Sequence, residues 1–555
     1  MPVLSGQMPA RRASDVFVEC LEAEGVKHVF GIPGEETLDL NESLADSSVE
    51  FVPVRHEQGG AYIADVYGRL TGRAGVCLGT LGPGATNLVT AVADAFLDRA
   101  PLVALTGQAD LERMHKESHQ YIDIVEVMRP ITKWNARLND ARIIPEVVRK
   151  AFKVAESEKP GSTHIELPED VMASEIEAEP LPRRKPVQPE PAARELLRAA
   201  DLIRGALNPV ALAGNGAVRA GAAPALREFV RATGIPVAET FMGKGLLDPT
   251  AGPKALGSVG LQAGDYKMAG FEEADVVISF GYDLVEQSPQ TWNPGRDKTI
   301  VCIDSLPAEI DEYFVPEVEL VGDIYHVLSR LGEECRHVPH SGGSTRLREV
   351  VFGRFEAAKD DDHFPMQPPR ALYEIRKALG RDDILISDVG LHKLWIGRMF
   401  PAYEPNTVLI ANGLAGMGFA VPAAIATKLV HPQRKVVAVN GDGGFLMNCQ
   451  ELETAKRLGT AFVTVIWENR QYGSIVWKQD KKFGRHFGVD FTNPDFVQLA
   501  TSFGLPAWRC ESVDDFSRYL GQALALDEPS LIVLPIDYSI DVAITEELGR
   551  ETVAT

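Results

Sequence analysis

The strongest chemical signal in the sequence is an acidic residue set among glycines directly after an apolar run. Residues 436–439 lead into the turn sequence NGDGG, in which the acid is Asp442, and a helical pattern follows. Glycines at a strand-to-helix turn let a phosphate approach the backbone, and the free N–H groups of the new helix face that anion. No Gly-Lys-Ser/Thr follows, so the turn is not a P-loop. Because Asp442 would repel a bare phosphate, we predict a divalent cation between the two.

A second ligand for such a cation follows at the end of the next apolar run. Residues 462–467 end at Glu468 and Asn469, and Asn469 lies 27 residues after Asp442. One βαβ unit returns the chain to the same edge of a sheet, so we expect Asn469 beside Asp442. With the Gln471 backbone carbonyl, phosphate oxygens and a water, they would form the octahedral oxygen shell of Mg²⁺. The alternative, a plain turn and a helix cap, explains each feature alone but not their meeting at one edge.

The elements that position these residues form an alternating pattern along nearly the whole chain. Short apolar runs, punctuated by Gly or Asp, alternate with helical periodicity, which is typical of buried parallel strands in α/β units. We predict an α/β fold with strands at residues 26–30, 51–54, 76–80, 102–106, 164–167, 210–213, 277–281, 300–303, 384–387, 408–410, 436–439, 462–467 and 531–534.

Two polar stretches divide this pattern into three domains. The first is rich in proline and is predicted as a linker at 183–195, and the second is predicted as a linker at 341–366. One continuous sheet is disfavoured because single cores stop growing near about 250–300 residues. We therefore predict α/β domains at 1–182, 196–340 and 367–555.

Composition excludes several classes of protein. The 555 residues carry 56 basic and 78 acidic side chains, a net charge of −22 that disfavours binding to nucleic acid or to an anionic membrane. The six cysteines show no CxxC spacing, which argues against a metal cluster or a disulfide scaffold. No apolar run is long enough to span a membrane, and residues 1–12 lack the apolar region of a secretory signal. We expect a cytoplasmic protein.

The spacing from GDG at 441–443 to Asn469 resembles the signature of thiamine diphosphate-dependent enzymes. Within that family the chain looks like the acetohydroxyacid synthase branch, and residues 118–120, 281–286 and 472–482 are similar to the catabolic, flavin-independent acetolactate synthases. Further matching motifs are VFGIPG at 29–34, RHE at 55–57, GPGATN at 82–87, TGQ at 106–108, ELP at 166–168, MGKG at 242–245 and GMGF at 416–419.

The resemblance implies a fold, cofactors and an assembly. The three domains would be doubly wound parallel sheets: a pyrimidine-binding domain, a central domain and a diphosphate-binding domain. Thiamine diphosphate and Mg²⁺ would be the cofactors, with Asp442, Asn469 and Gln471 as metal ligands. The two cofactor-binding domains would come from different subunits, so we expect a homodimer or homotetramer with active sites at the dimer interface.

The resemblance also implies catalytic roles for Glu57, Gln120 and His119. Glu57 would hydrogen-bond N1′ of the aminopyrimidine ring and activate the cofactor without touching the substrate. Taken alone, Glu57 could equally be an acid in the first turn of a helix. Gln120 would reach the active site, and His119 would be a proton-transfer or substrate contact, although a histidine in mixed surroundings is more often structural.

The remaining predicted contacts follow the family's pattern. Met417 would wedge between the cofactor rings, although core packing is the commoner role of methionine, and His392 could instead be a helix cap. Predicted substrate contacts are Ile32, Gln120, Ile475 and Lys478. Predicted cofactor contacts are Glu57, Gly82, Gly390, Leu391, His392, Ala415, Met417, Gly441, Asp442, Gly443, Gly444, Asn469, Gln471, Tyr472 and Gly473.

Two departures from the family pattern concern bound flavin and substrate charge. The Gly214-Asn215-Gly216 turn is too short a match to a dinucleotide fingerprint, and residues 282–286 replace the arginine and paired aspartates of flavin-binding members, so we expect no bound FAD. Glu35 and Glu36 stand where catabolic members usually carry Ala-Lys, and Lys478 replaces a glutamine. We hypothesise that Lys478, paired with Glu36, now meets the substrate carboxylate; the alternative is that both are solvated surface charges.

The expected reaction is the decarboxylation of one pyruvate and condensation with a second pyruvate to give 2-acetolactate and CO₂. Alternatives within the same chemistry are another 2-oxoacid decarboxylase, an aldehyde carboligase or a C–C hydrolase. Alternatives from other classes are a nucleotide-dependent oxidoreductase built on the Gly214 turn and a non-catalytic binding paralogue. The presence of Glu57, Asp442 and Asn469 argues against the paralogue.

Overall fold

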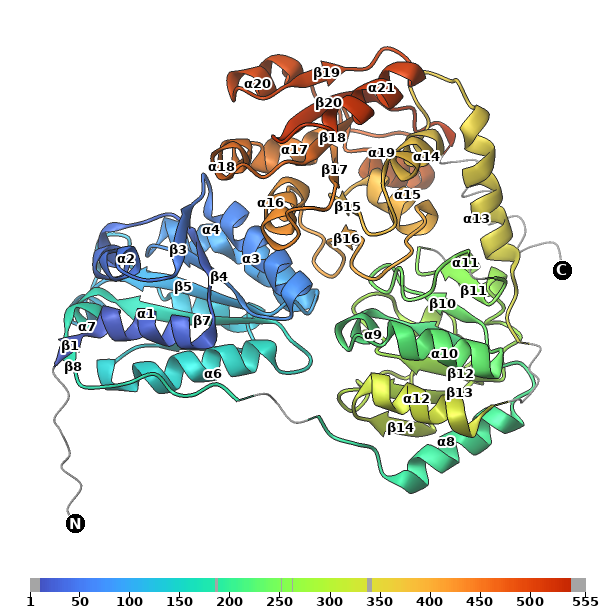
Figure 1. Ribbon diagram of the computed structural model, residues 1–555, viewed down its shortest axis with the longest axis horizontal. Coiled ribbons are helices and arrows are strands. Elements are labelled where there is room, and N and C mark those ends of the chain that lie inside the picture. The colour runs from blue at the N-terminus through green and yellow to red at the C-terminus, as the bar shows by residue number, and fades with distance from the viewer. Residues whose placement is uncertain (1–9, 185–187, 251, 262, 337–341, 541–555) are drawn as a thin grey trace. The chain divides into compact units, whose positions relative to one another are not determined.

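The computed structural model describes residues 10–184, 188–250, 252–261, 263–336 and 342–540 (Figure 1). Within these residues the chain forms three six-stranded sheets in which every neighbouring pair of strands is parallel. Helices cover both faces of each sheet. This architecture confirms the predicted α/β fold class with doubly wound parallel sheets.

The first sheet has the strand order β3-β2-β4-β5-β7-β6. Helices α1, α2 and α6 bury their apolar stripes against one face of this sheet, the face toward which Val76 and Leu78 point. Cys77 points toward the opposite face, which helices α3 and α4 cover. The strands are β2 (His28–Gly31), β3 (Glu50–Pro53), β4 (Gly75–Gly79), β5 (Leu102–Gln108), β6 (Trp134–Arg137) and β7 (Ser162–Pro168); β1 (Arg11–Arg12) and β8 (Glu175–Ile176) pair separately. The helices are α1 (Ala13–Glu24), α2 (Leu38–Ala45), α3 (Glu57–Thr71), α4 (Pro83–Leu97), α5 (Ile124–Met128), α6 (Ile144–Glu156) and α7 (Glu169–Ala173).

The middle sheet has the order β11-β10-β9-β12-β13-β14. Helices α8, α10 and α12 cover one face with small and branched apolar side chains. The strands are β9 (Val210–Ala213), β10 (Val237–Glu239), β11 (Ala255–Ser258), β12 (Val276–Phe280), β13 (Thr299–Asp304) and β14 (Val318–Val321). The helices are α8 (Ala193–Gly205), α9 (Asn215–Arg219), α10 (Ala223–Thr233), α11 (Ala263–Met268) and α12 (Ile324–Glu334).

The last sheet has the order β16-β15-β17-β18-β20-β19. Helices α14, α15 and α21 contribute to a core that continues into the middle sheet. The strands are β15 (Ile384–Ser387), β16 (Val408–Ile410), β17 (Val436–Gly441), β18 (Val463–Glu468), β19 (Ala507–Arg509) and β20 (Ser530–Pro535). The helices are α13 (Arg346–Ala357), α14 (Pro368–Ala378), α15 (Leu391–Met399), α16 (Ala420–Val430), α17 (Asp442–Asn448), α18 (Glu451–Leu458), α19 (Gly473–Phe483), α20 (Phe496–Ser502) and α21 (Val513–Ala523).

Each sheet starts near its middle and winds outward in both directions. The reversal falls between β2 and β4 in the first sheet, between β9 and β12 in the middle one, and between β15 and β17 in the last. Open α/β sheets bind ligands at this reversal, outside the carboxyl ends of the strands. The fold therefore offers three candidate crevices, one for each sheet.

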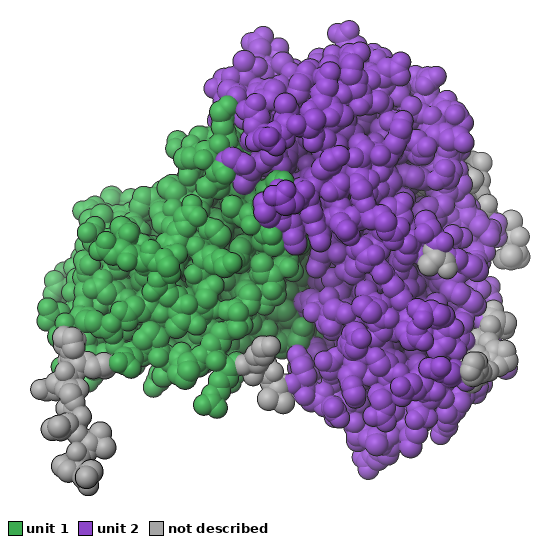
Figure 2. All heavy atoms as spheres, in the orientation of Figure 1, with its two compact units in different colours: residues 1–186, 425–430, 448–458 green, residues 187–424, 431–447, 459–555 purple. Residues whose placement is uncertain are grey.

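The chain forms two compact units, which Figure 2 colours separately. Unit 1 comprises residues 1–186 together with the short segments 425–430 and 448–458, so it includes α18 from late in the chain. Unit 2 holds the middle and last sheets. The predicted linker at 341–366 contains helix α13, whose Leu347, Val351 and Phe355 are buried. Residues 185–187 of the first predicted linker and residue 341 of the second lie outside the described residues.

No helix among the described residues is both long and apolar enough to cross a bilayer.

Candidate active site

The turn after β17 brings Asp442 and Asn469 together in unit 2. Gly441, the last residue of β17, pairs with Trp467 of β18, so the two strands end at the same edge of the sheet. The backbone N–H of Asn469 donates to Asp442 Oδ2 at 3.0 Å. The Asn469 side chain has no hydrogen bond within the described part of the chain, so its amide oxygen is free to bind a ligand beside the carboxylate.

The Asp442 carboxylate is 1% exposed and organises the loop that follows β18. Its Oδ2 also accepts from the Arg470 N–H at 2.6 Å and from Asn493 Nδ2 at 2.9 Å, whereas within the described residues Oδ1 accepts only from the Gly443 N–H at 2.9 Å. Oδ1 therefore keeps the capacity to bind a cation. Asn493 was not predicted, because it lies in an irregular segment 51 residues after Asp442.

Two non-glycine residues in predicted cofactor-binding segments adopt left-handed backbone conformations. Ala415 has φ 59° and Arg470 has φ 59°. Such conformations cost about 1 kcal/mol or more and persist where the surroundings enforce them, often at functional sites. Arg470 separates two predicted metal ligands, Asn469 and Gln471, and Ala415 precedes Met417, which is half-buried.

His392 is the second residue of α15, which begins after the short turn that follows β15. A Cβ on Gly390 would fall 2.7 Å from His392 Cε1 and one on Gly441 would fall 3.2 Å away, so both glycines make room for the ring. Burial lowers the pKa of His392 to about 3, against a hydrogen bond to the Asp388 backbone. The ring is therefore neutral. Its Nε2 is buried and has no hydrogen-bond partner among the described residues.

Asp388, which directly follows β15, fixes the loop at residues 413–419. Its carboxylate is fully buried and accepts from the Gly418 N–H at 3.0 Å and from the Val389 N–H at 2.6 Å. Burial raises the pKa of Asp388 to about 6, and the backbone hydrogen bonds oppose this rise. A Cβ on Gly444 would lie 3.2 Å from Asp388 Oδ2. Asp388 was not predicted, although an acid directly after an apolar run is the same signal that identified Asp442.

The start of α19 packs against the same edge. The Tyr472 N–H donates to the Val489 carbonyl at 3.0 Å, and the Tyr472 ring lies 4.9 Å from that of Phe491. A Cβ on Gly443 would lie 2.8 Å from the Tyr472 ring, and a Cβ on Gly473 would lie 2.8 Å from Leu391 Cδ1. These two glycines therefore allow the segments to meet.

The rest of α19 is open to solvent in the chain. None of its residues is buried, and the predicted substrate contacts Ile475 and Lys478 are both exposed. An exposed apolar side chain beside an exposed cation suits contact with a small carboxylate, but their role in substrate binding stays a prediction.

In unit 1, Glu57 is the first residue of α3 and is 6% exposed. Asn87 Nδ2 donates to Glu57 Oε2 at 2.9 Å, and a Cβ on Gly84 would lie 3.3 Å from Oε1. Oε1 has no hydrogen-bond partner among the described residues, so one carboxylate oxygen is fixed and the other is available to a ligand. Asn87 belongs to the GPGATN motif, and its role as the side-chain partner of Glu57 was not predicted.

The structure also brings together Gly82 and Gln120, which lie 38 residues apart in the sequence. Gly82 has φ 53°, and a Cβ there would fall 2.6 Å from the Gln120 carbonyl oxygen, so this position requires glycine. Gln120 itself has φ 57°, and the side chains of His119 and Gln120 are exposed. Ile32, directly after β2, is half-buried.

Glu36 is held within its own unit. Thr80 Oγ1 donates to Glu36 Oε2 at 2.9 Å. Lys478 belongs to the other compact unit. The pairing of Glu36 with Lys478 therefore stays a prediction.

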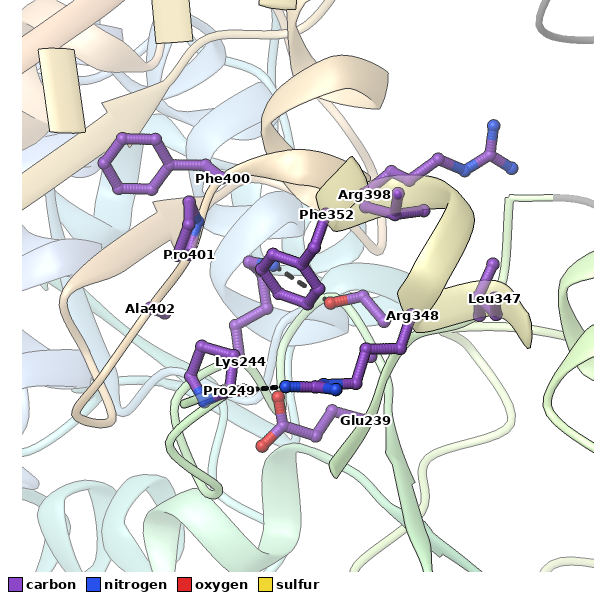
Figure 3. Close-up of a pocket in the computed structure, with 13 residues that line it drawn as sticks. Glu239, Lys244, Pro249, Leu347, Arg348, Phe352, Arg398, Phe400, Pro401 and Ala402 are labelled. Atoms are coloured by element: carbon purple, nitrogen blue, oxygen red, sulfur yellow. Dashed lines mark hydrogen bonds between the residues drawn. The ribbon is translucent and has the colours of Figure 1, made fainter. Parts of the chain in front are cut away.

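The MGKG motif lies at a different place, a small cavity in unit 2 (Figure 3). Lys244 is 7% exposed and its Nζ donates to Ser258 Oγ at 2.9 Å. The cavity has a volume of about 20 Å³, which suits a single water. None of its lining residues is a predicted site residue, so this motif supports packing rather than the site.

No group of three or more His, Cys, Asp or Glu side chains in the described residues could hold a metal ion. The predicted set contains one carboxylate, one amide and one backbone carbonyl. Such a set needs further oxygen ligands from a bound anion and water.

Comparison with known proteins assigns all three sheets to one class. The N-terminal thiamine pyrophosphate-binding domain of thiamine pyrophosphate enzymes matches residues 11–127. The central domain of these enzymes matches residues 196–331, and their C-terminal thiamine pyrophosphate-binding domain matches residues 388–534. Asp442 and Asn469 fall within the last match, and Glu57 falls within the first.

Curated relatives narrow the class further. The acetolactate synthase of Bacillus subtilis is 35% identical over 97% of this chain and 96% of its own length. The catabolic acetolactate synthase of Raoultella terrigena is 36% identical over 95% of each chain, and the chloroplastic acetolactate synthase 2 of Zea mays is 33% identical over 95% of this chain and 86% of its own. The chain belongs to the acetolactate synthase family of thiamine pyrophosphate enzymes, as the sequence motifs predicted.

Proposed function

We propose that this protein is an acetolactate synthase, which converts two pyruvate molecules into 2-acetolactate and CO₂. The observation that carries the proposal is the Asp442 turn, where a buried carboxylate whose Oδ1 accepts a single hydrogen bond lies beside an Asn469 side chain that has no hydrogen-bond partner in the described residues. The family assignment over nearly the full chain supports the same activity.

The residues at the edge of the last sheet fit a diphosphate with Mg²⁺. Asp442, Asn469 and the Gln471 carbonyl offer the hard oxygen ligands that Mg²⁺ prefers, and diphosphate oxygens would fill other positions. For the buried His392 Nε2 to donate to the same diphosphate the ring must be protonated, because the neutral ring already uses its N–H on the Asp388 backbone; a bound anion would favour that protonated form. Gly390, Gly441, Gly443 and Gly444 keep side chains out of the turn, and Leu391, Tyr472 and Gly473 border it.

Glu57 would act on the cofactor's pyrimidine ring. Asn87 fixes Oε2, which leaves Oε1 for a hydrogen bond to the ring nitrogen. Thiamine diphosphate supplies the electron sink that permits loss of CO₂ from a 2-oxoacid. The contribution of the protein to catalysis would be to hold the cofactor and substrate in the reactive orientation and to keep water away from the reacting carbon.

The remaining predicted residues line the same site in this proposal. Ala415 and Met417 would hold the bent cofactor, and Gly82 would border its thiazolium side. Gln120, His119, Ile32, Ile475 and Lys478 would contact the substrate. The active unit would be a homodimer or homotetramer with sites at the dimer interface, built from the three predicted domains. Six free cysteines are consistent with a reducing, cytoplasmic setting.

The direct test is to supply thiamine diphosphate, Mg²⁺ and pyruvate and to identify the product by mass spectrometry. We expect 2-acetolactate and one CO₂ for each two pyruvates. Acetaldehyde as the main product would indicate a simple decarboxylase and would overturn the proposal. The Glu36 and Lys478 departures from the family pattern bear on the choice of acceptor, so simple aldehydes should be offered as competing acceptors.

A further inference from the structure

A buried carboxylate from α18 binds the backbone directly before Glu57. Glu451 is fully buried, and its Oε1 accepts from the Arg55 N–H at 3.0 Å and from the His56 N–H at 2.9 Å. Thr454 Oγ1 donates to Glu451 Oε2 at 2.6 Å and holds the carboxylate in this orientation. Although Glu451 lies 395 residues after His56, both belong to unit 1.

The first turn of α3 is shaped to admit this carboxylate. A Cβ on Gly59 would fall 2.7 Å from Glu451 Oε1 and 2.8 Å from both Cδ and Cγ. Only glycine at this position lets the side chain reach the two N–H groups. Arg457, from the same helix, also donates to the Pro53 carbonyl, so α18 holds the segment before α3 at two points.

The contact sets where α3 begins, and Glu57 is its first residue. Removing the carboxylate leaves two backbone N–H groups without an acceptor, each at a cost of about 1–3 kcal/mol if it stays buried. The segment would relax to find other partners and carry Glu57 with it. A displacement of about 1 Å at a reacting group can cost roughly 100-fold in rate.

We propose that Glu451 is a positioning residue for Glu57, acting through the backbone of Arg55 and His56. The inference rests on the proposed function, since it assumes that Glu57 activates thiamine diphosphate. Neither Glu451 nor Gly59 is a predicted contact of cofactor or substrate. Both residues instead support the backbone segment at the start of α3, although they lie far apart in the sequence.

The first experiment compares Glu451→Ala and Glu451→Gln with the wild type. Glu453→Gln is the matched control, because it makes the same change on the same helix and keeps an amide oxygen that accepts from Arg457 Nε, which leaves the Arg457 contact with Pro53 in place. Deuterium exchange at C2 of bound thiamine diphosphate, followed by NMR, reports on Glu57 directly. We expect Glu451→Ala to slow this exchange by roughly 10-fold to 100-fold. Glu451→Gln keeps an acceptor oxygen and should recover part of the rate, and Glu453→Gln should match the wild type.

A second readout needs no cofactor. Amide hydrogen exchange of the peptide spanning residues 50–60, measured by mass spectrometry, should show lost protection in Glu451→Ala and not in Glu453→Gln. Cofactor affinity should change little, because the diphosphate turn lies in the other unit. Unchanged C2 exchange or unchanged amide protection in Glu451→Ala would overturn the inference.

Gly59→Ala tests the same contact from its other side, and it replaces Glu451→Ala in both measurements if that variant does not fold. The added methyl should displace the carboxylate and slow C2 exchange, and the effect should shrink in a Glu451→Ala background, because both changes break one contact. Additive effects would contradict the inference. A wild-type protein that binds no thiamine diphosphate would instead refute the proposed function, while the amide exchange result would still judge the contact.

Discussion

The middle and last sheets are both parallel and reverse their strand order once, but the crevice at that reversal is filled by the protein in one sheet and left open to a ligand in the other. In the middle sheet the Glu286 carboxyl group accepts from the Asn215 N–H at 3.2 Å and from the Met242 N–H at 3.2 Å, so one of the protein's own side chains occupies the crevice. In the last sheet, His392 Nε2 is buried without a partner in the described residues and Asp442 Oδ1 is open to a cation.

The glycines at the two reversals also differ in the atoms that they contact. In the middle sheet, a Cβ on Gly214 would fall 2.6 Å from the Gly281 carbonyl oxygen, and one on Gly216 would fall 2.6 Å from Gly281 Cα. These glycines let two backbones touch, which needs no ligand. In the last sheet, Gly443 and Gly444 face the side chains of Tyr472 and Asp388. A glycine-rich turn at a reversal therefore does not define a site; the side chain that fills or frees the crevice does.

The largest effect is expected from Asp442→Ala, which removes the feature that separates the two crevices. Loss of the proposed metal-binding carboxylate should reduce acetolactate formation by more than about 100-fold, which exceeds the 10-fold to 100-fold loss typical of residues that support a metal ligand without touching the metal. Chelation of divalent ions should reproduce this loss in the wild type, and added Mg²⁺ should restore activity there but not in the variant. Full activity after chelation would show that no metal is needed at the turn.

A smaller effect is expected from Asp388→Ala, which frees the loop at 413–419. Gly418 loses a charge-assisted hydrogen bond, and such bonds contribute about 1.5–3 kcal/mol. We expect the Kd for thiamine diphosphate, measured by fluorescence quenching, to rise by roughly 10-fold or more. Ser387→Ala is the control, because the Ser387 hydroxyl donates to the Asp388 backbone carbonyl and not to its carboxylate. Equal affinities for the two variants would contradict this role.

Glu286→Gln tests the filled crevice and should change stability rather than catalysis. Burial raises the pKa of Glu286 to about 7, so its contribution to stability is present below the ordinary pKa of 4.5 and is lost as the pH rises through about 7. Glutamine cannot ionise. The variant should therefore melt at a higher temperature than the wild type at pH 8 and at a similar temperature at pH 5, by calorimetry. Activity should stay unchanged, and a lower melting temperature at pH 8 would contradict the prediction.

The smallest effect is expected from Lys478→Gln, on a helix that belongs to neither turn. Lys478 is exposed, so its interaction with a substrate carboxylate is screened by solvent. We expect the KM for pyruvate to rise by roughly 2-fold to 5-fold with kcat nearly constant, since exposed ion pairs contribute about 0.2–1 kcal/mol. An unchanged KM would leave Lys478 as a solvated surface charge.

Most interior strands were predictable from sequence, together with the edge strands β3 and β16, whereas the interior strand β10 was missed. All thirteen apolar runs correspond to strands, because strands buried on both faces read as continuous apolar segments. The unpredicted strands of the large sheets are mostly edge strands, such as β6 and β19, whose side chains are half-buried or exposed and so lack an apolar run. Helix α13 was missed because its charged stretch reads as a linker although three apolar side chains pack inward.

For the site, local motifs predicted Asp442 and Asn469, whose meeting follows from one βαβ unit. Asn87, Asn493 and Glu451 were missed, because each acts through a contact between segments far apart in the chain. No spacing rule connects such pairs without knowing how the elements pack. The assignment to the thiamine diphosphate enzymes rested on several motifs together, and the comparisons confirm it.

The late arrival of α18 has a consequence for biosynthesis. Unit 1 starts at the N-terminus but is complete only at Leu458, about 270 residues after its first segment ends. At translation rates of about 5–20 residues per second, the nascent first segment waits roughly 15–50 s for its last helix. During that interval the Arg55 and His56 N–H groups lack the Glu451 acceptor, and the space beside Gly59 that this carboxylate fills is empty.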